Sequence, residues 1–307
     1  SLPVDTVAAM APGLAERIAD ALHGARLSSP EGDEAPVAAE RIRVPADPVS
    51  MGLAFTARGW GDGLPLIAPT ADRVERMLRG TRRARSELIA RLPPRNGAAT
   101  VEQVAINATL AGCLPEHLPV LLAAVEAAAQ PSLRLASLQT TTNPSTVAMV
   151  VSGPIVAALG LNAAGNCMGP GNWTNATLGR ALRLVLQNAG GGVADGLDRA
   201  TQGQPAKFGL CFAEHQAASP WPSLAAERGF AADTSVVTVA GALGTWNMHS
   251  TVSDALDLIA IIGDTMQYPA SSDYLHGGCP WLVLGPEHAA LLAGAGWDRT
   301  EVRRRLW

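Results

Sequence analysis

Short apolar runs typical of buried strands alternate along this chain with segments of helical periodicity, and this alternation constrains the fold most. Apolar residues at helical spacing predict helices over residues 4–23, 70–79, 85–92, 100–112, 115–129, 174–188, 252–262, 287–295 and 298–306. Short apolar runs predict strands over residues 41–44, 64–68, 147–151, 208–212, 236–240 and 281–284. We therefore expect an α/β or α+β fold, with helices packed on a mixed sheet whose strand order the sequence does not specify.

The first 50 residues differ in pattern from the rest of the chain. Residues 4–23 form an amphipathic segment, and residues 27–50 are rich in Pro, Ser, Glu and Asp. An apolar helical stripe without a local partner must be covered by something else. We expect this arm to contact a second copy in a homodimer, and residues 51–307 to form one ligand-binding or catalytic body of one or two lobes.

Composition limits the class of protein. The chain has 307 residues, of which 48% are hydrophobic and 16% charged, which excludes disorder for most of it. A net charge of −4 argues against nucleic acid or an anionic membrane as partner. The four cysteines stand singly, without a CxxC pair, and are expected to be reduced thiols. With no membrane-spanning run and no signal peptide recognised, we expect a cytoplasmic location.

The most informative polar stretch is the Gly- and Asn-rich loop at residues 165–177, directly before a strong helix. Glycines let the backbone approach a ligand, and a helix start offers free N–H groups to an anion. Either Asn172 or Thr174 is expected to be the N-cap. We predict ligand contacts from Asn166, Asn172, Trp173, Thr174 and Asn175. The alternative is a tight connection whose asparagines only cap and turn.

Two further polar segments are candidates for the same ligand site. Residues 140–146 gather hydroxyls and Asn143 in front of a strand, where they line a cleft or form a solvated loop. Asp62 lies between two glycines, where it presents a carboxylate to a ligand or bonds its own backbone in a turn.

A third segment, residues 211–215, carries the groups that suit catalysis. A thiol acts as a nucleophile, and a carboxyl or imidazole exchanges protons. Cysteine and histidine are also common structural residues, and that alternative stays open. The predicted catalytic residues are Cys167, Cys211, Glu214 and His215.

A metal site is a competing interpretation. The thiols, together with His117, His215, His249, Glu116 and Glu214, are suitable ligands. No pair has the HxxxH, HxH or CxxC spacing of a local site, so no metal ligand and no cofactor is assigned.

A set of short motifs is spread over about residues 52–306. They are Trp60-Gly-Asp-Gly-Leu-Pro65, Ala111-Gly-Cys-Leu-Pro-Glu116, Gly169-Pro-Gly171, Asn175-Ala-Thr177, Gly179-Arg-Ala-Leu182, Ser219-Pro-Trp221, Glu227-Arg-Gly-Phe230, Ser235-Val-Val-Thr-Val239 and Pro286-Glu-His-Ala289. Their combination resembles a bacterial family without an assigned reaction, associated with proteins that bear a selenocysteine/cysteine Gly-Ser-Cys motif. The resemblance implies thiol, selenol or sulfur chemistry alongside a second protein. Asn172 and His215 depart from the pattern, which indicates a different substrate.

Three hypotheses for function follow. The first is a thiol-dependent lyase or transferase of sulfur metabolism, acting on a small carboxylate, amide or sulfur compound in a cleft formed by residues 140–146, 165–177 and 211–215. The second is a non-catalytic subunit or ligand-binding protein that works within a complex. The third is a metal-dependent enzyme.

Overall fold

The computed structural model describes residues 41–267 and 279–307. Residues 38–307 form one compact unit. The other unit, residues 1–37, contains the predicted helix 4–23 and lies outside the described residues. Helix α2 (Pro48–Thr56) packs on the main core through Met51 and Phe55, and Val44 packs there too. The body therefore includes the last residues of the predicted arm.

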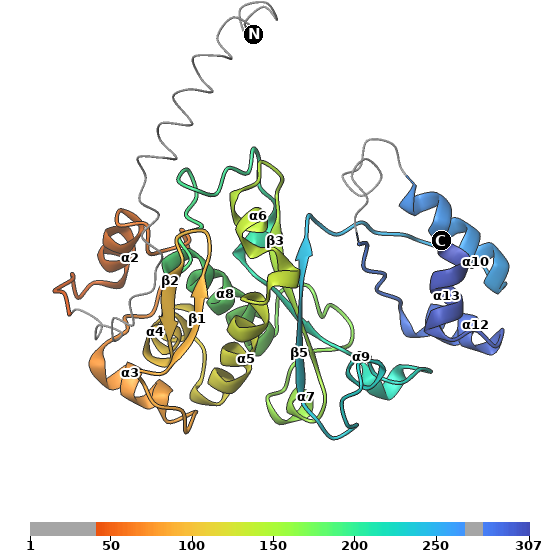
Figure 1. Ribbon diagram of the computed structural model, residues 1–307, viewed down its shortest axis with the longest axis horizontal. Helices are drawn as coiled ribbons and strands as arrows, with labels where there is room; N and C mark the ends of the chain where they lie inside the picture. The colour runs from red at the N-terminus through yellow and green to blue at the C-terminus, as the bar shows by residue number, and fades with distance from the viewer. Residues whose placement is uncertain (1–40, 268–278) are drawn as a thin grey trace, which may run out of the picture. The chain divides into compact units, whose positions relative to one another are not determined.

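Helices are the main regular elements of the described chain (Figure 1), and most of the longer ones lie where helical spacing predicts them. They are α3 (Ala71–Leu78), α4 (Val101–Ala111), α5 (Leu118–Ala128), α6 (Leu135–Thr140), α7 (Ile155–Ala158), α8 (Trp173–Asn188), α9 (Leu224–Glu227), α10 (Ala255–Met266), α12 (Pro286–Gly294) and α13 (Arg299–Leu306). None of the helices within residues 41–267 and 279–307 is long and apolar enough to cross a membrane.

A three-stranded mixed sheet lies at the centre of the fold. Its order is β4 (Leu210–Ala213), β3 (Thr146–Ser152), β5 (Val236–Ala242), with β3 parallel to β4 and antiparallel to β5. All three strands overlap predicted ones. Helices packed on a mixed sheet confirm the predicted fold class.

The helix predicted over residues 85–92 is wrong. The chain forms an antiparallel hairpin of β1 (Leu88–Leu92) and β2 (Gly97–Thr100). Pro93 and Pro94 cannot continue a helix, and Asn96, whose φ is 54°, precedes Gly97 in the turn. An Asn-Gly pair between two runs is a hairpin signal that helical spacing alone does not detect.

Three predicted strands, over residues 41–44, 64–68 and 281–284, are absent: the described backbone there is irregular. Their apolar residues indicated burial, which Leu66 confirms. Burial alone does not make a strand, because a strand also needs a neighbour to pair with. The amide of Ile67 donates instead to the carbonyl of Leu110, at the end of α4.

Two predicted helix starts are confirmed in atomic detail. Thr100 Oγ1 accepts from the amide of Gln103 at 3.2 Å, and Gln103 Oε1 accepts from the amide of Thr100 at 3.0 Å, which completes a capping box. Asp298 Oδ1 accepts from the amide of Glu301 at 2.7 Å and caps α13.

Helices α5 and α8 join the main core on one face of the sheet, where Met149, Val151 and Cys211 point. Val150 and Phe212 point to the other face and pack with Cys167 in a smaller cluster. Helix α8 lies directly on β4, because a Cβ at Gly179 would come within 3.0 Å of the amide nitrogen of Leu210. Glycine at this position therefore sets how closely the helix and strand approach.

A third cluster joins α10, α12 and α13 around Leu258, Ile262 and Leu292. Trp221 packs on this cluster from outside these helices, and its Nε1 donates to the carbonyl of Trp297 at 2.9 Å.

Candidate functional site

Helix α8 positions most of the residues predicted to bind a ligand. Its N-cap is Asn172, whose Oδ1 accepts from the amide of Asn175 at 2.9 Å, so the first of the two predicted caps is confirmed. Asn172 Nδ2 also donates to the carbonyl of Gly160 at 2.9 Å. The cap side chain therefore ties the preceding loop to the helix start.

Asn175 is 4% exposed and acts as a brace inside this loop. Its Oδ1 accepts from the amide of Asn162, and its Nδ2 donates to the carbonyls of Asn162 and Cys167, at 2.9, 2.9 and 3.1 Å. Asn166 Nδ2 donates to the carbonyl of Pro170 at 2.6 Å. The predicted ligand-binding asparagines thus bond the backbone of their own loop, as the alternative interpretation requires.

Trp173 and Thr174 connect the start of α8 to α4 and α5. Trp173 is exposed, and its Nε1 donates to the carbonyl of Gly112 at 2.9 Å. Thr174 Oγ1 donates to the carbonyl of Leu159 at 2.9 Å and lies 3.5 Å from Nε2 of His117. Burial lowers the pKa of His117, because a charged imidazole would lose its hydration there.

The thiols differ sharply in environment. Burial raises the pKa of Cys113 to about 12 and also raises the pKa of Cys211, because a thiolate is poorly solvated in the core. Cys211 is therefore unsuited to the predicted role of nucleophile. Cys167 is half-buried in the loop before α8, and Cys279 is exposed.

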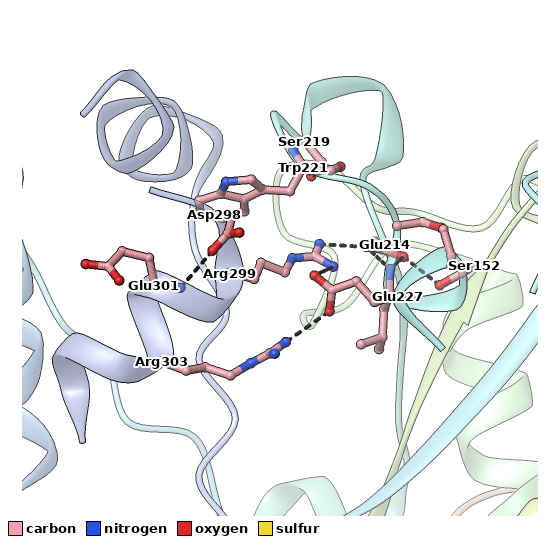
Figure 2. A network of polar contacts seen from close by, with 12 residues as sticks. Ser152, Glu214, Ser219, Trp221, Glu227, Asp298, Arg299, Glu301 and Arg303 are labelled. Atoms are coloured by element: carbon pink, nitrogen blue, oxygen red, sulfur yellow. Dashed lines mark hydrogen bonds and ion pairs between the residues drawn. The ribbon is translucent and has the colours of Figure 1, made fainter. Parts of the chain in front are cut away.

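Glu214 forms the centre of a polar network that attaches the C-terminal helices (Figure 2). Its carboxylate accepts from Ser152 Oγ at 2.8 Å, from the amide of Leu224 and from Arg299 Nη2 at 3.0 Å. Arg299 also pairs with Glu227 at 3.3 Å. This network uses Glu214 for structure, whereas the neighbouring His215 is exposed.

Asp62 is engaged in a turn. Its carboxylate accepts two hydrogen bonds from Arg180, at 2.6 and 2.8 Å, and one from the amide of Leu64 at 3.2 Å. Gln187 Nε2 donates to the carbonyls of Gly59 and Gly61, both at 2.9 Å. Side chains of α8 therefore hold the Gly-Asp-Gly turn in place, and the turn interpretation of Asp62 accounts for these contacts.

The sheet separates residues 140–146 from residues 211–215, whereas the structure connects residues 165–177 with residues 211–215 through the carbonyl of Asn162, which accepts from Asn175 and from the amide of Ala213. Residues 140–146 lead into the start of β3, whereas Glu214 follows the end of β4, which is parallel to β3. A seven-residue strand spans about 20 Å. Asn143 is exposed at the end of the sheet where β3 begins. The structure does not bring it together with residues 211–215, which lie at the other end.

A pocket opens at the end of the sheet where residues 140–146 lie. Its polar lining is Gln139, Ser145, Thr146, Arg183 and Asp198. Its apolar lining is Leu138, Val147, Leu182 and Leu186. The enclosed space is about 10 Å³, which is room for one water-sized group.

The two charged residues of this pocket, Arg183 and Asp198, form a nearly buried triad with Lys207. Arg183 Nη2 pairs with Asp198 at 3.1 Å, and Lys207 Nζ pairs with Asp198 at 2.8 Å. Arg183 Nη2 also donates to the carbonyl of Gly192 at 3.0 Å. Burial lowers the pKa of the Arg183 guanidinium, although Asp198 opposes this effect. Two cations face one carboxylate, which leaves one net positive charge beside the pocket.

Sequence reasoning identified the segment at residues 140–146 but missed Gln139, Arg183, Asp198 and Lys207. Lys207 is the sole lysine of the chain, which was the one visible signal. The others are ordinary residues of α6, α8 and a loop, and only folding brings them together.

Within residues 41–267 and 279–307, no group of three or more His, Cys, Asp or Glu side chains is arranged to hold a metal ion. Comparisons of the chain with protein-family models, curated proteins and solved structures give no match.

Proposed function

We propose that this protein binds a small carboxylate-bearing molecule in the pocket beside Arg183. One observation carries the proposal: the guanidinium of Arg183 is 14% exposed, and in the described part of the chain its Nη1 and Nε donate to no acceptor. These donors are therefore open to a group that enters from the solvent. A carboxylate would accept from them and would balance the net positive charge of the triad.

The size of the pocket limits this ligand. An enclosed space of about 10 Å³ admits one polar end of a molecule, so the ligand is small or extends outward. This proposal corresponds to the ligand-binding hypothesis and to the carboxylate substrate of the enzyme hypothesis.

Replacing Arg183 with methionine is expected to weaken the binding of glycolate and acetate at least about tenfold, because charge-assisted hydrogen bonds are lost. Binding is measured by ligand-observed NMR titration. The matched control is Arg180→Met, since Arg180 lies one turn earlier on α8 and pairs with Asp62 outside the pocket. The proposal fails if wild-type protein binds neither acid, or if both variants bind equally well.

A second candidate function is thiol chemistry at Cys167. Its carbonyl is held by Asn175 in the first turn of α8, and its side chain is half-buried against the sheet. The thiol lies in the loop before the start of α8, and solvent reaches it more than it reaches Cys113 and Cys211. This candidate assigns a catalytic role to Cys167, one of the four predicted catalytic residues. It corresponds to the sulfur chemistry that the resemblance implies.

Iodoacetamide at neutral pH is expected to label Cys167 faster than the more exposed Cys279, and to leave Cys113 and Cys211 unlabelled in the folded protein. Peptide mass spectrometry over time measures the rates, with Cys167→Ser as control. Faster labelling of Cys279 would show that exposure alone sets reactivity, and would remove this candidate.

A further inference from the structure

We propose that the outer edge of strand β5 pairs with β5 of a second copy of this chain. Two three-stranded sheets would then join edge to edge across a two-fold axis. No residue of β5 lines the Arg183 pocket, so the proposal does not depend on the proposed function. It comes from backbone groups of β5 that have no partner in the described part of the chain.

The hydrogen bonds of the central strand, β3, show which groups of β5 face outward. The carbonyl of Val151 accepts from the amide of Glu214, which follows β4, so the backbone groups of Val151 face β4. Successive residues of a strand direct these groups to opposite sides, so Val150 and the residues two positions away face β5. Opposite them in β5 lie Val236, Thr238 and Ala240. The N–H and C=O groups of Val237, Val239 and Gly241 therefore point away from β3.

These outward groups of β5 have no hydrogen-bond partner in the described part of the chain. Val237 and Val239 are half-buried, and Gly241 is exposed. The other outer strand, β4, differs, because the amide of Ala213 donates to the carbonyl of Asn162 at 3.2 Å. A row of unpaired N–H and C=O groups is a template for pairing with another strand. The sheet presents such a row at β5.

Strand β5 lacks the features that keep an edge strand from pairing. Proteins block such edges with charged side chains, proline or a bulge. The register of β5 with β3 runs without a shift over the whole strand. Residues 234–253 contain no proline and no Asp, Glu, Lys or Arg, in a chain that is 16% charged. The same edge of a second copy can therefore approach without repulsion between like charges.

The sequence of β5 fits an antiparallel copy of itself centred on Val239. In that register Val239 lies opposite Val239 of the second copy, and the outward groups of Val237 lie opposite those of Gly241. Each larger residue before the centre lies beside a smaller one after it, which suits cross-strand packing. The larger residues are Val236, Val237 and Thr238, and the smaller ones are Ala240, Gly241 and Ala242. This fit favours a second copy over an unrelated peptide as the occupant.

Sedimentation velocity of the full chain at micromolar concentration tests the proposal, and a dimer is expected for the wild-type protein. Val239→Pro is expected to raise the dimer dissociation constant at least about tenfold, because it removes the two hydrogen bonds nearest to the two-fold axis. Proline is tolerated in an edge strand where the N–H faces outward, so the variant should keep its own sheet.

Val236→Pro is the matched control, since the N–H of Val236 faces β3 and proline fits the first residue of a strand. This variant should remain a dimer. A monomeric wild-type protein at micromolar concentration would overturn the proposal. A folded Val239→Pro dimer as tight as the wild type would also overturn it, by placing the interface elsewhere, such as in the first 50 residues.

Hydrogen exchange of the wild-type protein decides the question if Val239→Pro fails to fold. Pairing of two copies is expected to slow exchange of the outward amides of β5 as the protein concentration rises. Exchange over residues 236–242 that does not depend on concentration, in a protein that sediments as a dimer, would overturn the proposal.

Discussion

Replacing Asn175 with alanine is expected to lower the free energy of unfolding by about 2 kcal/mol, since two backbone groups lose their partner and each unpaired group costs about 1 kcal/mol. These groups are the amide of Asn162 and the carbonyl of Cys167, whereas the carbonyl of Asn162 keeps its hydrogen bond from the amide of Ala213. Urea denaturation of the variant and the wild-type protein measures the change.

Two other asparagines provide graded controls for this prediction. Asn172→Ala removes the cap of α8 and is expected to cost about 1 kcal/mol. Asn143→Ala changes an exposed side chain and is expected to cost less than about 0.5 kcal/mol. Binding of glycolate by folded Asn175→Ala protein should be unchanged. Lost binding at unchanged stability would instead restore the interpretation that the Gly- and Asn-rich loop holds the ligand.

Replacing Arg299 with methionine is expected to cost about 2–3 kcal/mol of unfolding free energy, between the values for exposed and buried ion pairs. Arg299 is 21% exposed and pairs with both Glu214 and Glu227, and Figure 2 shows both carboxylates beside its guanidinium. Without the guanidinium, two carboxylates face each other across the contact between α13 and the segments after β4.

Arg303→Met is the matched control, because Arg303 also pairs with Glu227 but is 64% exposed. Exposed pairs contribute about 0–1 kcal/mol, so this variant should be close to wild type. Urea denaturation measures both variants. An equal loss of unfolding free energy in the two variants would show that the contact of Arg299 with Glu214 adds no stability. The network would then not anchor the C-terminal helices.

Two of the polar residues predicted to bind a ligand instead stabilise loops by hydrogen bonds to the backbone. Asn175 and Asp62 both appeared as ligand contacts, and both bond the backbone of a loop packed against α8. The residue types were correctly identified as demanding partners. Whether those partners are a ligand or a loop depends on which segments fold beside them, and spacing along the chain does not contain that information.

The sequence by itself determined the features that depend on neighbours a few residues away. The capping box of Thr100 and Gln103, the cap at Asn172 and the apolar strand around Met149 are all local, so their chemistry is visible in the order of residues. The mixture of such elements was enough to predict the fold class. Local spacing gave a wrong element at residues 85–92, where the Asn96-Gly97 turn overrode it, and at three short apolar runs that have no strand to pair with.

Only the tertiary structure decided where charge and free hydrogen-bonding groups gather. Gln139 of α6 and Arg183 of α8 line one pocket with Asp198, and Lys207, from the turn before β4, pairs with that aspartate. Glu214 and Arg299 meet although 85 positions separate them. Burial raises the pKa of Cys211, which disfavours the thiolate that a nucleophile requires. Desolvation and pairing depend on which atoms surround a group in space, and for these residues those atoms belong to distant parts of the chain.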